Sequence, residues 1–210
     1  MATTSPGNRI GYFFLALFAI FVGLYPVVFA FIIPPEEGLI GSKPVELLDK
    51  AFYLPVLYTH TSVGGIALLA GFSQFFKSLR RKRLNLHRTL GKIYVIAVLI
   101  SGSAALISAF FATGGMVTAI GFGLLAILWL YTTVQAYVTI RRKDINAHQR
   151  WMIRSYALCF AAVTLRIILP SLQFGLGMGF LSAYMIVSWA CWVPNILVAE
   201  LLIIPRLRTS

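Results

Sequence analysis

Two histidines occupy the same place in two copies of a short motif. Residues 80–89 read RRKRLNLHRT and residues 141–150 read RRKDINAHQR, so His87 and His148 lie 61 residues apart in matching surroundings. A neutral imidazole is a common ligand for haem iron and other metals, and a convenient proton carrier. If the two side chains converge, they could ligate the iron of one b-type haem or flank the headgroup of a quinone.

The polar residues around these histidines repeat as well. Asn85 matches Asn146, and at the same offset Gln74 matches Gln135. This order predicts a parallel repeat of two helical hairpins, related by an axis along the membrane normal. A simpler interpretation stays open: asparagine can stop a helix, and a histidine at a helix end can be purely structural.

A second set of polar residues lies inside apolar stretches. His60 and Arg166 are predicted at similar depths in the hydrocarbon, where an ionisable side chain is costly and points to function. Gly64 and Gly71 follow on the helix face of His60 and would leave a groove, suited to helix packing or to a flat cofactor such as haem. Arg166 requires an anion or carbonyl acceptors, so it could hold a ligand carboxylate or phosphate, extend outward, or bond carbonyls freed near Pro170.

Two further charged residues are predicted close to one membrane surface. Arg154 and Glu200 each lie one or two helical turns from the same end of their apolar runs. We expect them to form a structural ion pair.

The composition defines the environment of all these residues. Of the 210 residues, 59% are hydrophobic and 11% are charged, and the mean hydropathy is +0.85, which indicates an all-α integral membrane protein. The net charge of +12 does not indicate nucleic-acid binding, because the basic residues stand in short runs between apolar stretches. Cys159 and Cys191 both lie in apolar stretches and predict neither a disulfide nor a metal-binding pair.

Apolar runs of about 20 residues cross about 30 Å of hydrocarbon. They predict six transmembrane helices, in a single domain over residues 1–210, at about 11–33, 52–76, 91–112, 116–140, 152–172 and 180–204. Residues 34–51 predict a short amphipathic helix on the outer membrane surface.

The basic residues orient this bundle. In the predicted bundle, nearly all lysines and arginines lie near span ends on the same side of the membrane as the N-terminus. The exceptions are Lys43 and Lys50, on the opposite side, and Arg166, inside a span. The positive-inside rule therefore predicts that both termini are cytoplasmic, in a multi-pass protein of the cytoplasmic membrane.

Three longer strings resemble a known family. YTHTSVGGIALLAGFSQF, LHRTLGKIYV and HQRWMIRSYALCFAAVTLRIILP, within residues 53–170, are similar to the bacterial membrane proteins grouped as domain of unknown function 2306. The family name implies no activity. The positions that the resemblance implies are His60, His87, His148, Arg154 and Arg166. A looser similarity, of architecture only, is to di-haem cytochromes b, but two bis-histidine haems need four histidines and this chain has three.

Three functions follow from these observations. The first is a redox protein in which His87 and His148 ligate haem b or flank a quinone, with His60 and Arg166 as a second, outer polar site; its partners would be a quinone or another membrane redox component. The second is a bundle that binds or transports an anionic small molecule or lipid through Arg166 and His60. The third is a structural or accessory subunit whose polar residues only lock helices together. Whether the protein is an enzyme, and its oligomeric state, stay open at this level.

Overall fold

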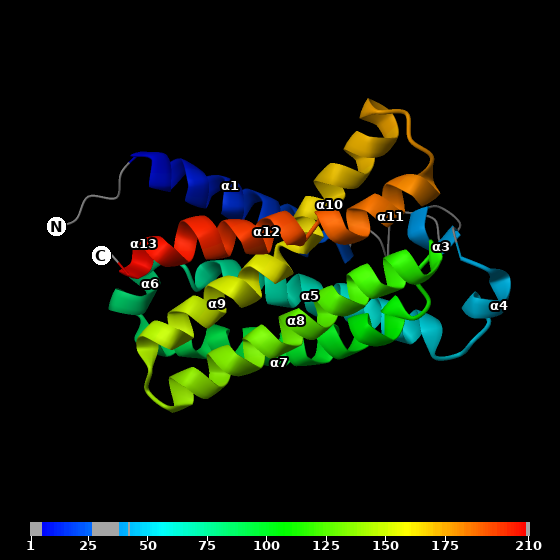
Figure 1. Ribbon diagram of the computed structural model, residues 1–210. Coiled ribbons are helices and arrows are strands. Elements are labelled where there is room, and N and C mark those ends of the chain that lie inside the picture. Colours follow the sequence, from blue (N-terminus) through cyan, green and yellow to red (C-terminus); the bar gives the residue numbers. More distant parts are fainter. Residues whose placement is uncertain (1–5, 27–37, 42, 209–210) are drawn as a thin grey trace.

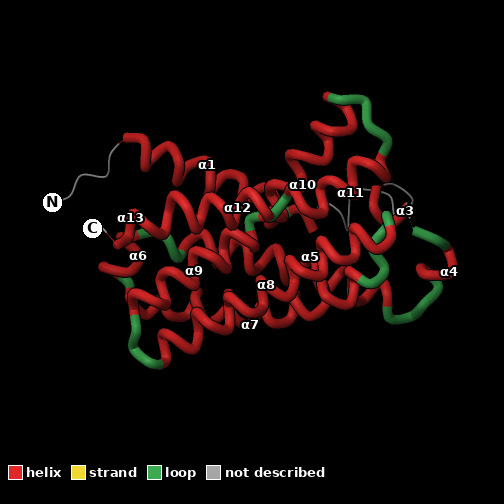
Figure 2. Tube along the Cα trace, viewed as in Figure 1, coloured by secondary structure: helices red, strands yellow, loops and turns green. Residues whose placement is uncertain are grey.

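A computed structural model describes residues 6–26, 38–41 and 43–208, and in this part of the chain the secondary structure is helical, with no strand (Figures 1 and 2). The longer helices are α1 (Pro6–Gly23), α5 (Tyr53–Ser73), α7 (Leu84–Ala109), α8 (Gly115–Arg141), α9 (Ile145–Cys159), α10 (Ala161–Pro170) and α11 (Phe180–Ala190). The shorter ones are α3 (Gly38–Gly41), α4 (Val45–Leu48), α6 (Lys77–Lys82), α12 (Val193–Val198) and α13 (Ile204–Arg208), with π-helical segments η1 (Ser171–Gly175) and η2 (Ala199–Ile203).

Five helical stretches are long and apolar enough to cross a membrane. They run over Tyr53–Ser73, Leu84–Ala109, Gly115–Arg141, Ile145–Gly175 and Phe180–Leu207. They match five of the six predicted spans. For the first predicted span, residues 11–33, the apolar helix Phe13–Gly23 is shorter, and residues 27–33 lie outside the described residues.

The helices start earlier than the apolar runs do. α7 begins at Leu84 and α9 at Ile145, about two turns before the predicted spans at 91 and 152. For α9 the reason is local, because Asp144 caps the helix and its side chain accepts a hydrogen bond from the Ala147 N–H at 2.9 Å. Polar residues within these first turns therefore lie on helices rather than in loops.

The predicted surface helix within residues 34–51 is realised only as short turns. α3 and α4 are four residues each, and residues 34–37 and 42 lie outside the described part. Lys43 between them is buried, and its Nζ donates a hydrogen bond to the Phe111 carbonyl at 2.6 Å.

The core is a four-helix arrangement of two hairpins. α5 packs along α7 and α8 packs along α9, while α7–α8 and α5–α9 contacts close the bundle. α1 covers α5, and α11 and α12 lie against α8 and α9. In Figure 1 the start of α1, α6, the α8–α9 turn and α13 lie at one end of the bundle, whereas α3 and α4 lie at the other, so the basic segments gather at one end.

Candidate functional site

His87 and His148 come together at the basic end of the bundle. Each is the fourth residue of its helix, α7 for His87 and α9 for His148, and each is half-buried. The imidazoles lie close enough for their charges to interact, and Arg80 lies close enough to act on both. The two side chains that the repeated motif singled out are therefore near one another.

The nitrogen atoms of the two rings differ in their partners. The His148 Nδ1–H lies 2.8 Å from the Ala136 carbonyl, and because a carbonyl only accepts, Nδ1 is the donor and Nε2 keeps its lone pair. The Nδ1 atom of His87 is buried and has no hydrogen-bond partner among the described residues. One ring is thus oriented by the backbone, and the other has a buried polar atom that a ligand could satisfy.

The polar residues that accompany the histidines are less regular than the repeat predicted. Gln74 is buried at the C-terminal end of α5, where its Nε2 donates to the Ser73 hydroxyl at 3.2 Å. Gln135 is half-buried inside α8, which continues to Arg141. Asn85 and Asn146 are exposed second residues of α7 and α9 and cap neither helix. The interpretation of these asparagines as helix stops is therefore wrong.

A closed ring of hydrogen bonds lies deeper in the core and was not singled out by the sequence. The ring begins at the Trp129 indole N–H, which donates to the Tyr94 hydroxyl at 3.5 Å. The Tyr94 hydroxyl lies 2.6 Å from the Ser155 hydroxyl, which lies 2.6 Å from the Thr133 hydroxyl. The Thr133 hydroxyl closes the ring by donating to the Trp129 carbonyl at 2.7 Å. Because an indole only donates and a carbonyl only accepts, each hydroxyl donates once and accepts once. Tyr94 and Ser155 are also 61 residues apart, so the repeat offset was the signal that could have found them.

His60 is held by its own chain. Its Nδ1 lies 3.2 Å from the Ser101 carbonyl and 3.1 Å from the Ser101 hydroxyl, and that hydroxyl donates to the His60 carbonyl at 2.8 Å. A Cβ at Gly64 would lie 3.0 Å from the same Ser101 Oγ. The serine of α7 therefore fills the space beside His60 that the glycine leaves.

The lower part of the predicted groove is filled by aromatic rings. A Cβ at Gly71 would lie 2.6 Å from the Tyr156 ring and 2.8 Å from the Tyr94 ring, and both tyrosines are buried. Of the two uses considered for Gly64 and Gly71, these close contacts support helix packing.

Arg166 on α10 is half-buried and only partly satisfied. Its guanidinium donates to the Ala162 carbonyl at 2.9 Å and stacks over the Tyr25 ring at 4.2 Å, while its Nε atom is buried without a hydrogen-bond partner in the described part of the chain. It also lies close enough to His60 for their charges to interact. The two polar residues predicted at similar depth are therefore neighbours.

Arg154 and Glu200 form an ion pair. The Arg154 Nε and NH2 groups donate to the two carboxylate oxygens of Glu200, the second at 2.9 Å, and the guanidinium lies 4.6 Å from the Trp151 ring centre. Glu200 stands in the π-helical segment η2, which joins the last helices to α9. The contact is one between helices and touches neither histidine site.

The described residues contain no group of three or more His, Cys, Asp or Glu side chains placed to hold a metal ion. Cys159 and Cys191 are buried free thiols.

The long apolar helices define a multi-pass membrane protein. The chain belongs to the DUF2306 family of predicted membrane proteins, whose sequence model matches residues 57–203. No curated protein and no solved structure gives a significant match.

Proposed function

We propose that this protein is a redox protein of the cytoplasmic membrane that holds one b-type haem between His87 and His148. The observation that carries the proposal is the nearness of two imidazoles from α7 and α9, one of which is oriented by its Nδ1–H on the Ala136 carbonyl. Ligating histidines commonly donate their other ring N–H to a backbone carbonyl, which fixes the tautomer.

Two interactions between residues at the repeat offset support this pairing. His87 and His148 interact, Tyr94 and Ser155 hydrogen-bond, and both pairs join residues 61 apart. The second pair lies seven residues, or two helical turns, further along the same two helices. Contacts between matching residues are what an axis along the membrane normal produces.

The other residues of the site suit a haem. Arg80 lies near both imidazoles and could hold a propionate, and the buried Nδ1 atom of His87 lacks a partner among the described residues. A haem bound there would exchange one electron through its iron. The chain itself would supply two imidazoles and the nearby guanidinium of Arg80.

An absorption spectrum of the purified protein tests the proposal. Protein from haem-replete cells should show a Soret band that shifts on reduction and is lost in His87→Ala and in His148→Ala. His60→Ala is the matched control, because it removes the third histidine at a different site and should keep the band. A colourless wild-type protein would refute haem binding, as would a band that survives in both variants; a colourless protein that retains a quinone lost in the same variants would assign the pair to quinone binding.

Arg166 supports a second candidate function, the binding of an anionic small molecule. Its Nε is buried without a hydrogen-bond partner in the described part of the chain, beside His60. Mass spectrometry of co-purified molecules should then find an acid that is lost in Arg166→Gln and kept in the control Arg142→Gln, which changes an exposed arginine. If neither this species nor a chromophore is found, the remaining assignment is the structural or accessory subunit.

A further inference from the structure

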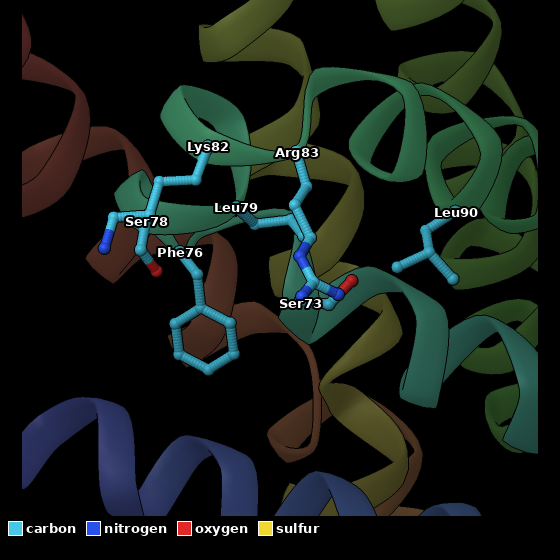
Figure 3. Close-up of a pocket in the computed structure, with 7 residues that line it drawn as sticks. All are labelled: Ser73, Phe76, Ser78, Leu79, Lys82, Arg83 and Leu90. Atoms are coloured by element: carbon cyan, nitrogen blue, oxygen red, sulfur yellow. The ribbon is translucent and has the colours of Figure 1, made fainter.

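A hollow opens at the basic end of the first hairpin, where α5 ends and α6 and α7 begin. Its volume is about 330 Å³, and Figure 3 shows the residues that line it: Ser73, Phe76, Ser78, Leu79, Lys82, Arg83 and Leu90. The lining of the hollow is therefore part apolar and part positively charged. Phe76, Leu79 and Leu90 are apolar, while Lys82 and Arg83 bring two positive charges.

These two charges have no carboxylate partner in the described part of the chain. Asp144 caps α9 and Glu200 pairs with Arg154, while Glu46 and Asp49 lie at α4, at the opposite end of the bundle (Figure 1). Position 144 also matches position 83 at the repeat offset, so the second hairpin has a carboxylate where the first has a guanidinium. The hollow is thus an anion-attracting feature of the first hairpin.

We propose that this hollow binds the phosphate of an anionic phospholipid. Arg83, whose guanidinium Figure 3 shows beside Ser73, would hold the phosphate, and Lys82, whose side chain runs past Ser78, would add a second positive charge. The hollow lies where α5, a membrane-spanning stretch, ends at Ser73, which is the depth of lipid headgroups.

The apolar part of the wall distinguishes a lipid from a soluble phosphate. A lipid can bury its glycerol and first acyl carbons against the apolar side chains of Phe76, Leu79 and Leu90. Inorganic phosphate has no carbon atoms and gains nothing from this surface. The site is independent of the haem proposal, because the hollow is lined by neither His87 nor His148.

Native mass spectrometry of the full protein in detergent can measure this binding. The protein is titrated with phosphatidylglycerol or phosphatidylcholine of the same acyl chains, and we expect at least fivefold tighter binding of phosphatidylglycerol. The double variant Lys82→Gln/Arg83→Gln should lose this preference. The control Arg81→Gln/Arg142→Gln removes the same charge from exposed residues that do not line the hollow, and should keep it.

Three results would overturn the proposal. The wild-type protein could bind the two lipids equally, or both double variants could lose the preference to the same extent, which would reduce the effect to overall charge. Inorganic phosphate could also displace phosphatidylglycerol at the lipid's own concentration, which would make this a soluble-anion site. Helical circular dichroism checks that each variant is folded, and an unchanged absorption spectrum in Lys82→Gln/Arg83→Gln separates this site from the histidine pair.

Discussion

Replacing Gly71 by alanine tests how tightly the centre of the bundle is packed. The new Cβ would lie 2.6 Å from the Tyr156 ring and 2.8 Å from the Tyr94 ring, closer than carbon atoms approach in folded proteins. Tyr94 is 0% exposed and Tyr156 3% exposed, so neither ring can turn out of the way without moving other core residues. Overpacking of this kind costs about 1–3 kcal/mol.

Gly123→Ala provides the matched comparison. Gly123 lies in α8, and a Cβ there would meet only the Ala109 Cβ at 4.0 Å, which is ordinary contact. Alanine favours a helix over glycine by up to about 1 kcal/mol, and this gain is shared by both variants. The difference between the variants therefore isolates the clash, and we expect Gly71→Ala to be less stable than Gly123→Ala by about 1–3 kcal/mol.

Unfolding in mixed micelles, followed by helical circular dichroism as the denaturing detergent is increased, measures this difference. A second arm places Gly71→Ala in a Tyr156→Leu background, where the nearest ring is absent and the penalty should shrink. Equal stability of Gly71→Ala and Gly123→Ala would refute the packing argument and reopen the groove on α5 as a binding surface.

Three further predictions concern other parts of the bundle. Tyr94→Phe removes one hydroxyl of the closed ring and should lower the free energy of unfolding by about 1 kcal/mol, the usual range for hydrogen bonds between membrane helices, measured in the same micelles. Burial lowers the pKa of Lys43 to about 8, so the unfolded chain holds this proton more tightly than the folded protein does. The melting temperature should therefore rise between about pH 8 and pH 10. Lys43→Met should abolish this rise and leave the pH dependence below about pH 7 unchanged. Glu200→Gln should cost no more than about 1 kcal/mol, because the carboxylate that pairs with Arg154 is 39% exposed, and should leave any absorption spectrum unchanged.

The sequence predicts the parts of this fold that the bilayer itself determines. A span must be about 20 apolar residues long, so hydropathy located five of the long helices. It could not place their ends, because capping by Asp144 and the helix-favouring basic segments extend α7 and α9 beyond the hydrocarbon. Gln135 shows the same limit: its spacing matches Gln74, but α8 continues where α5 ends.

Only the part of the candidate site that lies in the repeated sequence motif could be predicted. The matching surroundings of His87 and His148 predict that pair, and the same offset joins Tyr94 to Ser155, but an aromatic residue near a membrane interface is too common to indicate a contact. The sequence could not decide whether Gly71 serves helix packing or leaves a groove for a ligand. A glycine leaves space, and which side chain fills that space depends on the packing of α7 and α9 against α5.

The 61-residue offset that joins His87 to His148 gives His60 no histidine counterpart. Position 121 corresponds to His60, and it is a glycine whose Cβ would lie 2.8 Å from the Ser188 hydroxyl and 2.9 Å from the Trp189 indole nitrogen, so a second histidine does not fit there. Positions 101 and 162 also correspond at this offset, and the carbonyl of each has a basic side chain as its partner. His60 bonds the Ser101 carbonyl, and Arg166 bonds the Ala162 carbonyl. Away from the basic end, therefore, the two halves place one imidazole and one guanidinium against matching backbone groups. Such a mixed pair offers a single imidazole and so cannot ligate a haem iron from both sides.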